Sequence, residues 1–76
     1  MSKEAKKVYD LMLEQFKQTR NRKIQVQVRI DMRDKRTEIV AELEYEGLIS
    51  DCNIYGQQYI SCVLSDDSLC IIDIEY

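Results

Sequence analysis

The 76-residue sequence contains no histidine, tryptophan or proline and only two glycines. The lack of histidine removes the commonest general base and the commonest metal ligand. Two glycines cannot form a glycine-rich phosphate-binding loop. No run of about 18 apolar residues could span a membrane, and the opening MSKEAKKVYD lacks the apolar core of a signal peptide. These absences predict a cytoplasmic protein that is not an enzyme and has no membrane segment.

The three cysteines, Cys52, Cys62 and Cys70, are odd in number and include no CxxC spacing. An odd count without a signal peptide favours reduced thiols, and isolated cysteines are usually buried as small apolar side chains. A metal site would need a fourth ligand and closer spacing. We therefore expect no catalytic residues, no metal site and no cofactor.

Charge is distributed unevenly along the chain. Residues 1–36 hold all eleven Lys and Arg with five acids, a net charge of +6, whereas residues 37–76 hold nine acids and no base, a net charge of −9. Such asymmetry is typical of proteins that bind a charged partner such as nucleic acid. The alternative interpretation is that the two halves face each other, within the fold or between subunits, so that their charges cancel.

Residues 3–20 predict an amphipathic helix. Its apolar side chains recur at helical spacing and include Ala5, Val8, Met12 and Phe16. Ser2 is expected to cap the N-terminus, because its hydroxyl can accept a backbone N–H. Asn21 is expected to end the helix in the left-handed conformation.

Residues 23–32 alternate strictly between apolar and polar side chains, which is typical of a half-buried strand. The alternation resumes after a short polar break, over residues 36–46, where Val40 is the exception. A four-residue loop would pair the two segments as a hairpin with Val28 opposite Ala41 and all apolar partners on one face.

Three further strands are predicted over 48–55, 58–65 and 68–75, with Gly47 at a bend and Gly56 in a tight turn. The expected fold class is α+β, an N-terminal helix followed by a strongly curved antiparallel meander of about five strands in a single domain over residues 1–76. One helix covers only one sheet face, and the last strand would expose an apolar edge. The sheet is therefore expected to close into a small barrel or to pair with another subunit. The candidate oligomer edge consists of Ile72, Ile74 and Tyr76.

The order of a helix and five curved strands resembles the Sm-like small barrels, and the ending SDDSLCIIDIEY resembles the close of YolD-like domains. The Sm-like likeness covers most of the chain and lies in element order. In the Sm-like motif an aspartate follows a glycine by about six residues and an asparagine comes next. Here Gly47, Asp51 and Asn53 stand at a different spacing, and the second motif, a basic residue beside glycine, is missing. The resemblance implies RNA binding and ring assembly, but it assigns no RNA-contacting residue.

Two short segments resemble winged-helix proteins. Residues 43–49, LEYEGLI, are similar to a recognition helix running into its wing, and residues 63–69, VLSDDSL, are similar to the wing's exit into a final helix. This resemblance implies an alternative fold, a winged helix, in which residues 36–46 are helical and lie on DNA. The acids that this helix would carry are Glu38, Glu42, Glu44 and Glu46. Their carboxylates would repel phosphate groups.

Basic residues bracket the first predicted strand and are candidate contacts for an acidic partner or for nucleic acid. They are Lys17, Arg20, Arg22, Lys23, Arg33, Lys35 and Arg36. No aromatic residue is interleaved with them, although single-stranded nucleic acid usually stacks on aromatic side chains. A chain this short buries only about 60% of its unfolded surface, which favours association. Our first hypothesis is therefore a non-enzymatic regulator, adaptor or inhibitor that binds another protein and self-associates. The alternative is a nucleic-acid-binding protein, Sm-like on RNA or winged-helix on DNA.

Overall fold

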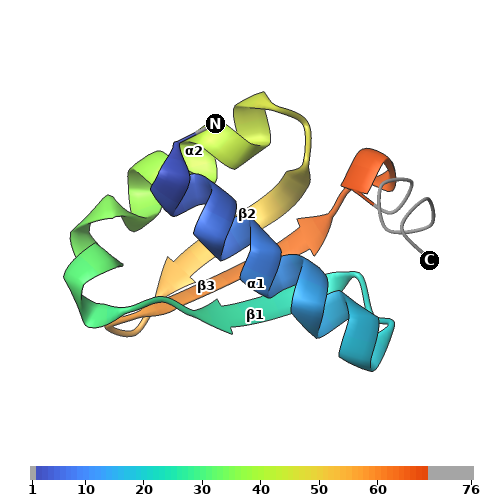
Figure 1. Cartoon of the computed structure of the whole chain (residues 1–76), viewed down its shortest axis with the longest axis horizontal. Coiled ribbons are helices and arrows are strands. Elements are labelled where there is room, and N and C mark those ends of the chain that lie inside the picture. The colour runs from blue at the N-terminus through green and yellow to red at the C-terminus, as the bar shows by residue number, and fades with distance from the viewer. Residues whose placement is uncertain (1, 69–76) are drawn as a thin grey trace.

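Two α-helices pack against a three-stranded antiparallel sheet in the computed structural model, which describes residues 2–68 (Figure 1). The elements in chain order are α1 (Lys3–Thr19), β1 (Lys23–Gln27), the 3-10 helix η1 (Ile30–Lys35), α2 (Arg36–Tyr45), β2 (Ile49–Tyr55) and β3 (Tyr59–Leu64). The strand order is β1-β3-β2, and residues 66–68 begin a further helical turn. None of the helices in this part of the chain is long and apolar enough to cross a membrane.

The predicted N-terminal helix is confirmed as α1. Ser2 caps it as expected, and its Oγ accepts a 3.1 Å hydrogen bond from the Ala5 N–H. The expected end at Asn21 is wrong by one residue, because Arg20 takes the left-handed conformation at φ 57° and donates its N–H to the Phe16 carbonyl. The side of α1 that carries Val8, Met12 and Phe16 is buried against the sheet and α2.

The strand predicted over residues 23–32 is confirmed only for its first half. Ile24 and Val26 are buried in β1 as the alternation requires, but the chain leaves the sheet after Val28 and forms η1. The partner of β1 is β3 rather than the segment after it, with Val26 opposite Ile60. Alternation thus located the buried face correctly, but it carried no information about which strand would lie alongside.

The strand predicted over residues 36–46 is wrong, because residues 36–45 form α2, as the alternative fold predicted. Ile39, Val40 and Leu43 are buried, whereas Ala41 and Tyr45 are exposed. Val40, which broke the alternation, therefore lies on the buried side of a helix, where positions three and four apart share a face, as Val40 and Ile39 do with Leu43.

Gly47 completes the C-terminal turn of α2. It adopts φ 73° and donates its N–H to the Glu44 carbonyl, while Leu48 donates to the Leu43 carbonyl. This pair of bonds is a Schellman motif, which ends a helix at a residue of positive φ, usually glycine. The motif turns the chain directly into β2.

The strands predicted over 48–55 and 58–65 are confirmed as β2 and β3, joined by a turn in which Gly56 has φ 59°. A bulge interrupts their pairing between Ser50 and Asn53, and Asp51 there adopts φ 50°. Residues 2–68 contain three strands in an open sheet, so the five-stranded, barrel-like arrangement is not what this part of the chain forms. The last predicted strand, 68–75, and the candidate oligomer edge lie outside the described residues except for Ser68, which is helical.

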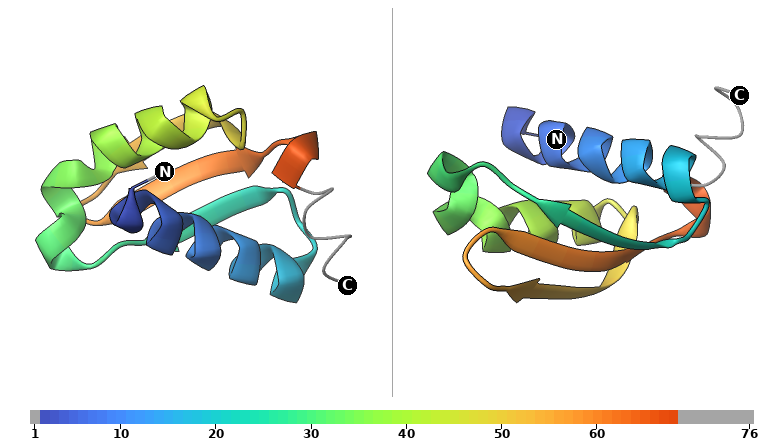
Figure 2. Two further views of the ribbon diagram at one scale, coloured as in Figure 1. Left: turned by 45° about the horizontal axis from the view of Figure 1, so that its top comes forward. Right: turned by 90° about the horizontal axis from the view of Figure 1, so that it is seen from below.

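The core lies between the two helices and one face of the sheet. Figure 2 shows α1 on one side of the strands and no helix beneath β2 and β3 in the right-hand view. The most deeply buried side chains come from every layer and include Met12, Ile24, Leu43, Ile60 and Leu64. The opposite face of the sheet and the outer sides of both helices are therefore left uncovered by the described elements.

Candidate functional site

The predicted basic residues fall into two groups, one at each end of β1. Lys17 and Arg20 end α1, and Arg22 and Lys23 lie at the start of β1, whereas the other three lie on η1 and at the start of α2. The members of this second group are Arg33, Lys35 and Arg36. The structure therefore does not unite the seven residues into one surface.

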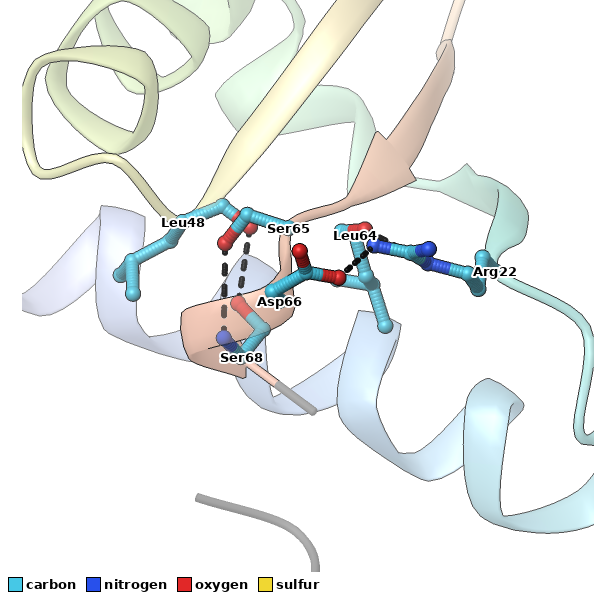
Figure 3. Close-up of polar contacts among 6 residues, drawn as sticks. All are labelled: Arg22, Leu48, Leu64, Ser65, Asp66 and Ser68. Atoms are coloured by element: carbon cyan, nitrogen blue, oxygen red, sulfur yellow. Dashed lines mark hydrogen bonds and ion pairs between the residues drawn. The ribbon is translucent and has the colours of Figure 1, made fainter. Parts of the chain in front are cut away.

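The first group contains the link between the basic and acidic halves. Arg22 lies 2.5 Å from the Asp66 carboxylate and donates its Nε–H to the Leu64 carbonyl (Figure 3). Among ion pairs formed between described residues, this pair is the one that joins the two halves. Its side chains are exposed, so it contributes little to stability. Among residues 2–68, the interpretation that the halves cancel within the fold is thus supported by this one ion pair.

Arg36, from the second group, holds the β2–β3 hairpin against α2. Its Nη1 donates to the Tyr55 carbonyl at 3.1 Å and to the Tyr59 carbonyl at 3.2 Å, and its Nε donates to the Arg33 carbonyl. These acceptors are neutral carbonyls, so they do not offset the positive charge of the Arg36 guanidinium at this end of the sheet. Lys35, in contrast, pairs with Glu4 at 3.6 Å.

Two tyrosines lie beside Arg36, and no pattern in the sequence connected them with the basic residues. The rings of Tyr55 and Tyr59 stack with their centroids 5.4 Å apart and an interplanar angle of 14°. Both remain partly exposed, at 38% and 39%. The sequence could have predicted this pair of tyrosines from their positions on either side of the Gly56 turn, because residues opposite each other in a hairpin share a face.

The stacked tyrosines belong to a larger surface, the outward side of the sheet, which we call the open sheet face. The strand register places Gln27, Tyr59 and Tyr55 in one row across the sheet. The full set of outward residues is Lys23, Gln25, Gln27, Ser50, Asn53, Tyr55, Tyr59, Ser61 and Val63. All of them are exposed or half-buried, and none is acidic. The one acid in the three strands is Asp51, at the bulge.

The second uncovered surface is the outward side of α2, which we call the α2 outer surface. It consists of Thr37, Glu38, Ala41, Glu44 and Tyr45, all exposed, and Tyr45 is 90% exposed. No ion pair or hydrogen bond between described residues engages the carboxylates of Glu38 and Glu44. This surface is thus negatively charged, with one large aromatic side chain at its C-terminal end.

The two described cysteines are reduced and poorly reactive. Burial raises the pKa of the Cys62 thiol to about 12, with Cys52 and Glu44 adding smaller effects. Burial also raises the pKa of the Cys52 thiol to about 11, helped by Glu44 and Asp51. A thiol with a raised pKa is almost entirely protonated at neutral pH and is therefore a weak nucleophile.

Residues 2–68 contain no pocket and no cluster of three or more Cys, Asp or Glu side chains arranged to hold a metal ion. Comparison of the chain with protein-family models, with curated proteins and with solved structures found no match in any of the three.

Proposed function

We propose that this chain is a protein-binding module that docks a positively charged partner on the α2 outer surface. The observation that supports this most directly is the placement of Glu38, Glu44 and the 90% exposed Tyr45 on the solvent side of one helix that carries no base there. Tyrosine is enriched at protein interfaces and at their energetic hot spots. Acidic side chains around it favour a basic partner and speed its association.

The acids near the C-terminus of α2 are unfavourable for the helix itself. The last turn of α2 has no basic residue, and Glu44 and Glu46 lie near the end where the helix dipole is negative. Each such carboxylate costs the helix about 0.3–1 kcal/mol at low ionic strength. Residues that oppose local stability without a compensating contact are typical of functional surfaces. A basic partner would supply the missing compensation.

The order of elements favours a winged-helix-like layout, with α2 in the place of the recognition helix and the β2–β3 hairpin as the wing. Such a helix reads DNA with donors and positive charges on its outer side. The α2 outer surface offers carboxylates at these positions, and they would face phosphate groups. A winged-helix layout that binds protein rather than duplex DNA reconciles the fold with this charge.

The test is site-specific photo-crosslinking in a lysate of the native host. A benzophenone amino acid replaces Ala41, which is exposed on α2, and as a control replaces Leu11, which is 49% exposed on α1. We expect a discrete protein adduct at position 41 that weakens with increasing salt and is missing at position 11. Mass spectrometry of the adduct identifies the partner, whose binding is then measured with purified proteins.

Charge-reversal variants provide the matched control. The variant Glu38→Lys/Glu44→Lys should weaken binding to the purified partner at least about tenfold, as expected for loss of charged contacts at an interface. Asp10→Lys/Glu14→Lys makes the same change in net charge on the exposed side of α1 and should leave binding unchanged. Equal losses in both variants, or an α2 surface that crosslinks to duplex DNA instead, would show that the proposal is wrong.

A further inference from the structure

We infer that the open sheet face binds single-stranded nucleic acid, a function independent of the partner proposed for α2. The face is one side of the three-stranded sheet, and no described element covers it (Figure 2). It presents the stacked pair Tyr55 and Tyr59 at one end and Lys23 at the other. The stacked tyrosines and the charge of this face, taken together, point to this ligand.

The aromatic pair supplies a stacking platform. The rings of Tyr55 and Tyr59 lie nearly parallel and remain about two-fifths exposed, at 38% and 39%. An exposed aromatic ring on a sheet can stack an unpaired base, and such contacts tolerate any base because every base has a π-face. Arg36 holds the backbone of both tyrosines through their carbonyls, so the rings have a fixed support.

Charge complementarity favours an anionic ligand on this face. The chain as a whole has a net charge of −3, yet no carboxylate has a register position on the open sheet face. Lys23 lies on the face itself, and the Arg36 guanidinium lies at the tyrosine end, where its acceptors are all neutral carbonyls. Along the register positions between these two charges a phosphate backbone would meet no carboxylate, since Asp51 lies outside those positions, at the β2 bulge.

The remaining side chains suit base edges better than a protein interface. Between the charged ends the face carries the amides of Gln25, Gln27 and Asn53 and the hydroxyl of Ser61. Amides and hydroxyls both donate and accept hydrogen bonds, as base edges require. Val63 is the only aliphatic side chain on the face, whereas protein interfaces need a larger apolar core.

The dimensions of the face match a short stretch of a single strand. Four residue steps along β1 span about 13 Å, and three strands cover about 10 Å from centre to centre. This area accommodates about two nucleotides, comparable with other sheets that stack bases on aromatic side chains. A duplex would keep its bases paired and stacked internally, so the tyrosines would have no base to receive.

The experiment measures binding of the full chain to fluorescein-labelled oligouridine and oligothymidine of 12 nucleotides by anisotropy, with a mixed-sequence duplex for comparison. We expect binding to the single strands that falls with salt, and weaker binding to the duplex. Titration monitored by amide NMR should shift the signals of Tyr55, Tyr59, Gln27 and Ser61 but leave those of Ala41 and Tyr45 in place. This mapping uses the wild-type chain, so it does not depend on a variant that folds.

Variants then separate stacking from charge. Tyr59→Ala should weaken oligonucleotide binding at least about fivefold, whereas Tyr59→Phe, which keeps the ring, should bind nearly as wild type. Lys23→Gln should reduce the slope of log affinity against log salt by about 0.7, the value for one phosphate contact on a single strand. Tyr45→Ala, which removes the exposed tyrosine of α2, is the matched control and should leave binding unchanged.

Three outcomes would overturn the inference. They are no anisotropy change at 20 mM salt with 100 μM protein, equal losses from Tyr45→Ala and Tyr59→Ala, and NMR shifts confined to α2. The first two leave the crosslinking test of the α2 outer surface unaffected, whereas shifts confined to α2 would place nucleic acid on that surface and count against both proposals.

Discussion

The hydroxyl of Tyr9 on α1 donates a 2.7 Å hydrogen bond to the Oγ of Ser68, which is fully buried 59 residues further along the chain. Ser68 in turn donates to the Leu48 carbonyl at 2.8 Å, where the chain enters β2 (Figure 3). The same carbonyl accepts the Ser65 N–H, and the Ser65 hydroxyl accepts the Ser68 N–H at 3.4 Å. These bonds tie α1, the start of β2 and the exit from β3 together at one point.

Removing this junction should lower stability in steps. Tyr9→Phe deletes the buried hydrogen bond to Ser68 and should cost about 1 kcal/mol in the free energy of unfolding. Ser68→Ala deletes two and should cost about 2 kcal/mol. Ser61→Ala on the open sheet face, whose side chain makes no such buried bond, should change stability by less than about 0.5 kcal/mol. Urea unfolding followed by circular dichroism measures all three. Equal effects of Ser61→Ala and Ser68→Ala would contradict the structural role of the junction.

Comparison of the fold with the sequence shows which local patterns were sufficient to predict secondary structure and burial. Period-two alternation over Ile24, Val26 and Val28 marked a buried face correctly, because it depends only on burial. The same alternation over residues 36–46 led to a wrong strand prediction. With Val40 included, the apolar residues of this segment stand at both even and odd positions, and that pattern also fits a helix. Val40 was the informative residue, since a strand would have exposed it and the helix buries it at 6% exposure.

Val28→Asp tests the buried face of the first strand, which is independent of the pairing that the sequence suggested. Val28 is 2% exposed, and a carboxylate there would be buried without a partner. We expect a loss of about 3 kcal/mol or more in unfolding free energy. Gln27→Asp places the same group on the adjacent, exposed position and should cost under about 1 kcal/mol. A melting temperature of Val28→Asp near that of wild type would mean that Val28 is not buried.

The pH dependence of stability should reflect the buried thiols. Cys62 has a pKa of about 12 in the folded chain against 9.0 for an ordinary thiol, and Cys52 about 11. The unfolded chain therefore loses these protons first as pH rises, so stability contributed by the neutral thiols is complete below pH 9 and decreases between pH 9 and 12. For Cys62 the decrease is at most about 1.4 kcal/mol per pH unit.

Urea unfolding at pH 7, 9 and 10.5 measures this dependence, with Cys52→Ala/Cys62→Ala as the comparison. The double variant should be less stable at pH 7, because it leaves a cavity in the core, but its stability should fall less steeply above pH 9. Contributions from the groups that the two proteins share cancel in the difference. Parallel decreases in the two proteins would exclude the thiols as the cause.

The candidate surfaces could not be predicted from the sequence, because they are formed by residues that only the tertiary structure brings together. The sequence separates Arg36 from Tyr55 and Tyr59 by about twenty residues, and only the pairing of β2 with β3 and the position of α2 bring them together. The negative charge of residues 37–76 was evident from composition. That the open sheet face carries none of it at its register positions could be learned only from the strand register.

A side chain from α1 forms hydrogen bonds with backbone groups at the free edge of β1. Gln15 accepts the Gln25 N–H on its Oε1 at 2.7 Å and donates its Nε2–H to the Gln25 carbonyl, also at 2.7 Å. Nearby, the Asn21 Oδ1 accepts the Lys23 N–H. An unpaired strand edge can recruit a strand from another molecule, and side chains that occupy its backbone groups prevent this. The described edge of β1 is therefore a poor place for the predicted self-association.

Gln15→Ala should open this edge. The Gln25 amide loses its acceptor, so its hydrogen exchange should accelerate at least about tenfold, because a protected amide becomes accessible to water. The Val28 amide, which donates to the Gln58 carbonyl just beyond the paired residues of β1 and β3, is the internal reference and should keep its rate. Light scattering at increasing concentration should show more association of the variant than of wild type, since strand pairing at β1 becomes available. Unchanged exchange at Gln25 would mean that Gln15 does not hold the edge in solution, and association would then have to involve another surface.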